Sequence, residues 1–169
     1  MGIGPSSSHT VGPMVAGRRS STENVAGIVG MGAACELAVA QQKTEAERLG
    51  TLRDEMEAVL RQEGALIFGG EAERLSNTSL FGFPSIEGES MVVMLDQSGF
   101  AVASGAACSS MKEEPSHVLL AMGTPLDTAR TAVRVSLGAA TSAENIARFV
   151  SAAVSLRQQL GAMSSVCGD

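Results

Sequence analysis

The sequence contains no tryptophan and no tyrosine, and only 5 phenylalanines stand among its 169 residues. Proteins that stack on nucleic-acid bases use aromatic side chains for this purpose, and almost none are present here. Positive charge is also in the minority, with 12 basic against 18 acidic residues and a formal net charge of −6. Such a surface repels phosphate backbones and anionic lipids. We therefore expect neither nucleic acid nor an anionic membrane as a partner.

Cysteine is scarce as well. The three cysteines, Cys35, Cys108 and Cys167, are widely separated and form neither a CxxC pair nor a zinc-type spacing. We therefore expect reduced thiols, no metal site and a cytoplasmic location. We also expect no apolar run of membrane-spanning length, and the N-terminus lacks the basic-then-apolar order of a signal peptide. These absences predict a protein without a membrane segment.

The first third of the chain predicts a loop followed by two helices. Residues 1–19 are rich in Gly, Pro and Ser, which is typical of a loop or linker. Ser20 and Glu23 have the capping-box spacing that begins a helix. One face of this helix is predicted to be buried, and with it the thiol of Cys35: Val25, Ile28, Gly32, Cys35 and Val39. A second helix is predicted over residues 44–62, with Leu49, Leu52, Met56 and Val59 directed inward.

The remainder alternates short strands with helices. Buried strands are predicted at 65–70 and 78–83, the second ended by Pro84. A helix over 86–99 ends at a glycine, and a brief strand follows at 100–103. Short helical segments are predicted from Pro115 to Gly123 and after Pro125, then a strand at 131–138. Thr141 and Glu144 repeat the capping box for a last helix that ends near Gly161. The order indicates an α/β (α+β two-layer) fold, with helices on a small, mostly antiparallel sheet.

Two side chains stand out as candidates for chemistry. Cys108 lies in the stretch "VASGAACSSMKEEPSH", where small and polar neighbours suit an accessible loop thiol better than a core position. It could equally be a loop cysteine without a role, and Lys112 and His117 are its only nearby cations. Arg134 lies inside an alternating strand pattern, where it could form a surface salt bridge or bind a carboxylate with its guanidinium fork. His117, beside Ser116, suits a capping or structural role better than that of a base.

Several stretches together resemble the C-terminal part of cysteine desulfurases, which belong to the class V aminotransferase group: "RRSSTENVAGIVGMGAACELA", "EGESMVVMLDQSGFAVASGAACSSMKEEPSHVLLAMG" and "VRVSLG". The similarity covers about residues 18–160, in order. It implies the small C-terminal domain of a fold-type I pyridoxal-phosphate enzyme. It further implies that Cys108 accepts the sulfur of L-cysteine as a persulfide, that Arg134 binds the substrate carboxylate, and that Thr22 reaches the cofactor phosphate of a partner subunit. A sulfur-acceptor scaffold protein, and a homodimer or pairing with a full-length desulfurase, are the partners that the resemblance implies.

The chain departs from this family in one important way. The cofactor domain, with its Schiff-base lysine, has no counterpart, and the two lysines present, Lys43 and Lys112, lie outside the family's lysine motif. In its place Ile3–Met14 resembles the opening motif of iron–sulfur L-serine dehydratases. We therefore expect a segment of residues 1–17 joined to a desulfurase-like domain of residues 18–169, whether by gene fusion, truncation or artificial joining. Cysteine desulfurization with help from another chain is one possible function. A non-catalytic module that accepts persulfide or binds a partner is the alternative, and a serine dehydratase remnant is a third.

Overall fold

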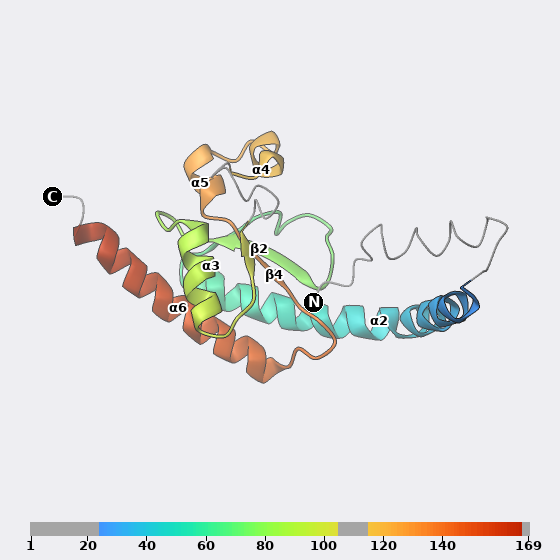
Figure 1. Cartoon of the computed structure of the whole chain (residues 1–169). Helices are drawn as coiled ribbons and strands as arrows, with labels where there is room; N and C mark the ends of the chain where they lie inside the picture. The colour runs from blue at the N-terminus through green and yellow to red at the C-terminus, as the bar shows by residue number, and fades with distance from the viewer. Residues whose placement is uncertain (1–23, 105–114, 167–169) are drawn as a thin grey trace. The chain divides into compact units, whose positions relative to one another are not determined.

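Residues 24–104 and 115–166 are described in this computed structural model, with side chains described as far as residue 162. The chain divides between Arg48 and Leu49 into two compact units. The elements, shown in Figure 1, follow in the order α2 (Val25–Gln62), β1 (Leu66–Ile67), β2 (Thr78–Gly82), α3 (Gly88–Gln97), β3 (Ala103–Ser104), α4 (His117–Ala121), α5 (Leu126–Arg130), β4 (Val133–Ser136) and α6 (Ala143–Val166). The α/β arrangement of helices on a short antiparallel sheet is as predicted. The expected boundary between residues 17 and 18 lies outside the described residues.

The two helices predicted at the start form one continuous helix, α2. The prediction of a break before residue 44 was wrong because Gln41, Gln42 and Lys43 are all good helix formers, and no glycine or proline interrupts them. The helix is capped at Asn24, whose Oδ1 accepts a hydrogen bond from the amide of Gly27 at 2.9 Å. The predicted cap at Ser20 lies outside the described residues.

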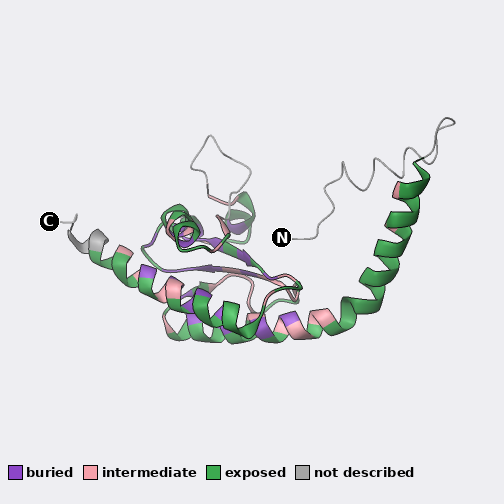
Figure 2. Cartoon of the chain, turned by 60° about the horizontal axis from the view of Figure 1, so that its bottom comes forward, coloured by how far each residue is buried: buried purple, intermediate pink, exposed green. Residues whose placement is uncertain are grey.

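The N-terminal half of α2 is exposed, contrary to the predicted buried face. The exposed fractions are 62% for Val25, 42% for Ile28 and 73% for Val39, and Cys35 is exposed as well. Figure 2 shows this half of the helix almost entirely in the colour of exposed residues. Apolar periodicity alone cannot say whether a partner is present, and within the described residues of its own unit this face has none. The prediction that Cys35 is buried was therefore wrong.

The same helix contains an apolar stretch of membrane-spanning length, and the expectation that the chain has none was wrong. An 18-residue window within α2 reaches a mean hydropathy of 1.3 and has none of its residues buried. The reason is that Glu36 is the single charge between Val25 and Gln42. By length and composition α2 is the one helix among the described residues that could cross a membrane. Core helices and signal sequences meet the same criterion, so this finding does not establish a membrane segment.

The second unit is built on a four-stranded antiparallel sheet with the order β1-β2-β4-β3. The strand predicted at 78–83 is confirmed as β2, and that at 131–138 as the shorter β4. The strand predicted at 65–70 shrinks to β1, in which Leu66 is 44% exposed rather than buried, because glycines with positive φ stand on both sides of it. The strand predicted at 100–103 begins only at Ala103, as β3.

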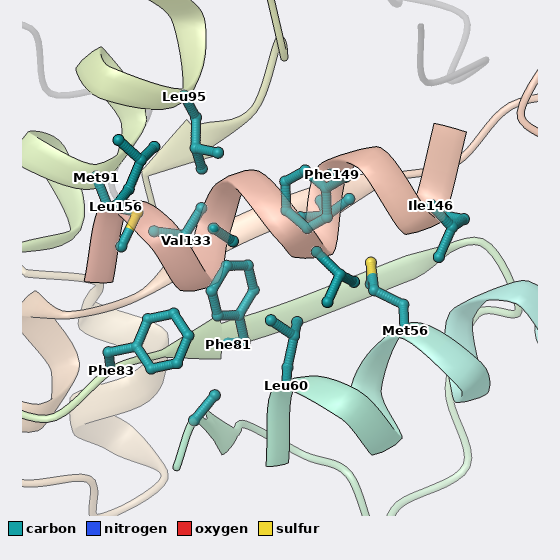
Figure 3. Packing of buried hydrophobic residues seen from close by; sticks show 14 of the residues in the cluster. Met56, Leu60, Phe81, Phe83, Met91, Leu95, Val133, Ile146, Phe149 and Leu156 are labelled. Carbon is teal, nitrogen blue, oxygen red and sulfur yellow. The ribbon is translucent and has the colours of Figure 1, made fainter. Parts of the chain in front are cut away.

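The core lies between one face of this sheet and three helices. Leu49, Leu52, Met56 and Leu60 of α2 meet β2, β4, α3 and α6 in one apolar cluster, part of which Figure 3 shows. The Phe81 ring lies edge-on to Phe83 at 5.7 Å and to Phe149 at 6.2 Å between centroids, a favoured aromatic geometry. The prediction that Val59 points inward was wrong, since it is 42% exposed. Leu60, four residues after Met56, takes the inward place instead.

The ends of α3 and α4 lie close to their sequence signals, whereas α6 differs at both ends. It continues to Val166, past the predicted end near Gly161, because a glycine can lie inside a helix at a cost of about 1 kcal/mol. Gly99 follows α3 with a φ of 86°. The cap of α4 is the Ser116 hydroxyl, which accepts a bond from the Leu119 amide at 3.5 Å, and not His117, which is the first residue of the helix. The last helix is capped by Ser142 rather than by the predicted Thr141. The Ser142 hydroxyl accepts from the amide of Asn145 at 3.2 Å, and the Asn145 side chain accepts from the Ser142 amide at 3.0 Å, which is a capping box one residue later.

Candidate functional site

Arg134 lies near the middle of β4, and the alternation of the strand decides its side of the sheet. Val133 and Val135 point into the main core with exposed fractions of 1% and 7%, whereas Arg134 between them is exposed. Successive side chains of a strand point to opposite faces. The guanidinium group therefore stands on the sheet face that turns away from the main core.

The register of the sheet places Arg134 beside the exit of the cysteine segment. Arg134 pairs with Leu80 of β2 on one side and with Ala103 of β3 on the other. Strand β3 ends at Ser104, directly before the segment that carries Cys108. Cys108 itself lies outside the described residues, as do Thr22 and the Ile3–Met14 stretch. Arg134 is thus one strand away from the point where the cysteine segment leaves the sheet.

The chain that follows the cysteine segment packs on the same face of the sheet as Arg134. The chain is described again from Pro115, and α4 follows with His117 exposed at its start. Helices α4 and α5 pack together through Leu119 and Ala129, and Leu80 of β2 packs against this small cluster. Figure 1 shows both helices on the side of β2 and β4 opposite α6. Since α5 leads almost directly into β4, both ends of the cysteine segment are attached to elements next to Arg134.

The sequence left two interpretations of Arg134 open, a surface salt bridge and a carboxylate ligand. Within residues 24–104 and 115–166, no carboxylate lies in salt-bridge distance of its guanidinium. Of the two interpretations open from the sequence, the surface salt bridge is therefore not seen in the described part of the chain. With no acidic partner among these residues, the exposed guanidinium has N–H donors whose fork matches the geometry of a carboxylate.

A buried ion pair elsewhere in the unit was missed by the sequence analysis. Glu57 of α2 is 1% exposed, and its carboxylate accepts hydrogen bonds from Arg74 at 2.5 and 2.6 Å. Burial raises the pKa of Glu57, but the bonds from Arg74, the nearby Ser79 hydroxyl and the charge of Arg61 outweigh it, so the pKa is lowered. The Ser79 hydroxyl is close enough to act on this pKa without a well-formed hydrogen bond. The only sequence signal was an acid among the inward positions of a helix.

The described part of the chain offers one lysine as a possible partner of a cofactor. Lys43, on α2, is the one lysine within residues 24–104 and 115–166, and it is exposed. A lysine that forms a Schiff base is normally enclosed by the cofactor and its pocket. The described residues therefore do not fit a bound pyridoxal phosphate by themselves.

Comparison with known protein families shows to which family this chain belongs. The sequence model of the aminotransferase class-V family matches residues 8–149. The chain belongs to the aminotransferase class-V family. Similar relatives include cysteine desulfurase IscS of Dictyoglomus turgidum, 44% identical over 76% of this chain, and a cysteine desulfurase of Bradyrhizobium diazoefficiens, 40% identical over 88%.

Solved structures agree with the sequence matches. A structure titled NifS-like protein superimposes with a TM-score of 0.71 at 31% identity and covers 84% of this chain. A NifS-like protein from Rickettsia africae gives a TM-score of 0.70 at 26% identity. The resemblance to cysteine desulfurases and the fragment-like fold of a fold-type I enzyme are thereby confirmed. This aminotransferase class-V chain spans only 33% and 38% of the length of the two relatives named above.

Proposed function

We propose that this chain is the sulfur-accepting part of a cysteine desulfurase, in which Cys108 takes the sulfur of L-cysteine as a persulfide. One observation carries the proposal: the register pairs Arg134 with Ala103, next to the exit of the cysteine segment. Cys108 is five positions after Ala103, so at about 3.6 Å per residue their Cα atoms lie within about 18 Å. A carboxylate held by Arg134 and a sulfur presented to Cys108 are therefore compatible with one small substrate site.

The atoms and electrons of the proposed sulfur transfer balance between Cys108 and one molecule of L-cysteine. The Cys108 thiolate attacks the sulfur of L-cysteine, a sulfur–sulfur bond forms, and the carbon–sulfur bond of the substrate breaks. The electron pair of the broken bond goes to the substrate carbon, which takes up the proton released by the substrate thiol and leaves as alanine, while Cys108 keeps the sulfur as a persulfide. Arg134 has the part of holding the carboxylate of the substrate, because its guanidinium can bind both oxygens.

Pyridoxal phosphate supplies an electron sink for such chemistry when it is bound. Because the described residues do not fit this cofactor alone, we assign it to a further domain that carries the lysine. Thr22 is proposed to reach the cofactor phosphate across a subunit contact, as the family resemblance implies. A sulfur-acceptor scaffold protein as the recipient of the persulfide, a homodimer or a pairing with a full-length desulfurase, and a cytoplasmic location belong to the same proposal.

A non-catalytic persulfide acceptor is the second candidate, because it would need no lysine besides the exposed Lys43 of the described residues. Both candidates require Cys108 as the acceptor of sulfur. They differ in Arg134, which matters only when L-cysteine is the sulfur source. The resemblance of Ile3–Met14 to serine dehydratases gains no support from the described residues and stays a prediction.

The test compares two sources of sulfur on the same variants. An alkyl persulfide donor should load Cys108 and release the alkyl thiol, and mass spectrometry of the peptide should find one added sulfur. Cys108→Ser should remove this signal. Arg134→Ala should load normally from the donor but at least about 10-fold more slowly from L-cysteine with a cofactor domain supplied, because a bidentate carboxylate contact is lost. Arg130→Ala, an exposed arginine on α5, is the matched control.

Each outcome decides between the candidates. Donor loading together with an Arg134-dependent reaction of L-cysteine supports the desulfurase. Donor loading with no reaction of L-cysteine favours the non-catalytic acceptor. Loading of Cys35 or Cys167 while Cys108 stays unmodified would refute both.

A further inference from the structure

We propose that the cavity between the first turns of α6, the end of β4 and residues 99–102 (the α6 cavity) binds a small carboxylic acid with an apolar tail. The carboxylate lies at Arg148 on the rim, and the tail enters the cavity beside the ring of Phe100. The inference does not rest on the sulfur transfer proposed above, because none of the residues that line this cavity takes part in that reaction.

The α6 cavity exists because β3 and β4 pair over only two residues. Ala103 is the first residue of β3 that pairs with β4, so residues 99–102 run beside the end of β4 outside the ladder. The start of this segment is held by α3, since the Phe100 amide donates a hydrogen bond to the carbonyl oxygen of Leu95 at 2.9 Å. The space that remains between the segment, β4 and α6 has a volume of about 250 Å³.

The floor of the α6 cavity is apolar. It is formed by Leu137, Ile146 and Phe149, which are 4%, 7% and 4% exposed because they also belong to the main core. Figure 3 shows Ile146 and Phe149 on the side of α6 that faces the sheet. The ring of Phe100 meets Phe149 edge-on, with 5.6 Å between the centroids, and forms one wall. An apolar group placed here would lose contact with water without displacing a core side chain.

The rim of the α6 cavity carries hydrogen-bond donors and no acid. Arg148 is exposed, and no carboxylate within residues 24–104 and 115–162 lies in salt-bridge distance of its guanidinium. Asn145 accepts hydrogen bonds from Ser142 with its Oδ1, which leaves the two N–H groups of its Nδ2 as donors. None of the residues that line the cavity is acidic, although the chain has 18 acidic against 12 basic residues. Donors above an apolar floor match a carboxylate that is followed by an apolar tail.

The size of the α6 cavity limits the ligand. Drug-sized ligands occupy cavities of about 300–1,000 Å³, so this smaller one suits a molecule of about six carbon atoms rather than a nucleotide or a folded partner. A more open hollow of about 480 Å³ adjoins it, and Phe100 and Arg148 line both. One guanidinium can neutralise the single charge of a carboxylate, whereas a phosphate monoester carries almost two charges at neutral pH.

The experiment titrates the whole 169-residue chain with hexanoate and follows methyl groups by NMR. Val102 and Ile146 line the α6 cavity, and Val39, 73% exposed on α2, is the control methyl group. We expect saturating shifts at Val102 and Ile146 with a Kd of about 1 mM, which is an ordinary ligand efficiency for a molecule of this size. Butanoate should bind about 15-fold more weakly, because it buries about two methylenes fewer.

Recognition of the charge is tested separately from burial of the tail. Hexan-1-ol has the same tail without the carboxylate and should bind about 5-fold more weakly than hexanoate. Arg148→Gln should weaken hexanoate by about the same factor and leave hexan-1-ol unchanged. Arg130→Gln is the matched control, because Arg130 is also exposed but does not line the cavity, and it should change neither affinity.

Three results would overturn the inference. Equal affinities for hexanoate and hexan-1-ol, or equal effects of Arg148→Gln and Arg130→Gln, would show that the cavity recognises no anion. Shifts at Val39 in place of Val102 and Ile146 would assign the apolar tail to α2. Shifts that rise without saturation up to about 10 mM, ten times the expected Kd, would show that the cavity holds only water.

Discussion

Replacing Glu57 by glutamine should destabilise the second unit far more than the loss of one surface charge would. The carboxylate is 1% exposed and holds Arg74 through two hydrogen bonds of 2.5 and 2.6 Å, with Arg61 at 3.6 Å. Removing its charge leaves two guanidinium groups around a neutral amide. Breaking a buried ion pair costs about 3–5 kcal/mol. We expect about 3 kcal/mol, the lower end, because the Arg74 side chain keeps 19% of its surface in water.

The measurement is urea and thermal unfolding of the whole chain, both monitored by circular dichroism. A loss of about 3 kcal/mol corresponds to a melting temperature lower by about 10 °C in a unit of this size. Glu63→Gln is the matched control, since Glu63 pairs with Arg157 at 3.3 Å while both side chains are more than a third exposed. Such surface pairs contribute at most about 1 kcal/mol. Equal losses for Glu57→Gln and Glu63→Gln would refute the reasoning.

The pH dependence gives a second check on the same residue. The pKa of Glu57 is lowered in the folded chain, because the arginine contacts outweigh the effect of burial. Its contribution to the free energy of unfolding is therefore fully present above the unfolded pKa of about 4.3, and is lost as the pH falls through the lower folded value. Glu57→Gln should flatten this part of the stability curve. A wild-type curve as flat as that of the variant below pH 5 would show that the ionised pair contributes little.

Three further outcomes follow from the structure. Ser85 has a φ of 64°, so Ser85→Gly should stabilise the chain by about 1 kcal/mol, and a lower urea midpoint would contradict this. A Cβ at Gly88 would lie 2.7 Å from the carbonyl oxygen of Ala132, so Gly88→Ala should lower the free energy of unfolding by about 1–3 kcal/mol. Gly30 is the matched control, since a Cβ there meets open space and Gly30→Ala should raise the helix content. Cys35, being exposed, should be alkylated by iodoacetamide in the native chain as fast as in urea; strong protection in peptide mapping would indicate a partner on α2.

The sequence alone determined those parts of the fold that depend on local signals. Strand β2 alternates and ends before Pro84, and α3 ends where Gly99 can adopt a positive φ. The start of α4 was predicted at Pro115, close to its observed beginning at His117, because proline suits the first turn of a helix. The motifs around Cys108 and Arg134 also placed the chain in its family. These features are set by nearby residues, so no knowledge of the tertiary structure was needed to find them.

Only the tertiary structure decided which surfaces meet. The pattern from Val25 to Val39 repeats as regularly as that from Leu49 to Met56. The second is buried because the sheet and helices of its own unit pack on it, whereas the described residues of the first unit leave the first pattern exposed. The pairing of Arg134 with Ala103 joins residues far apart in the chain through the strand register. The partnership of Glu57 with Arg74 likewise depends on the chain returning across α2. The periodicity of a sequence shows that one face of a helix is apolar, but contacts with residues far away in the chain determine whether that face is buried.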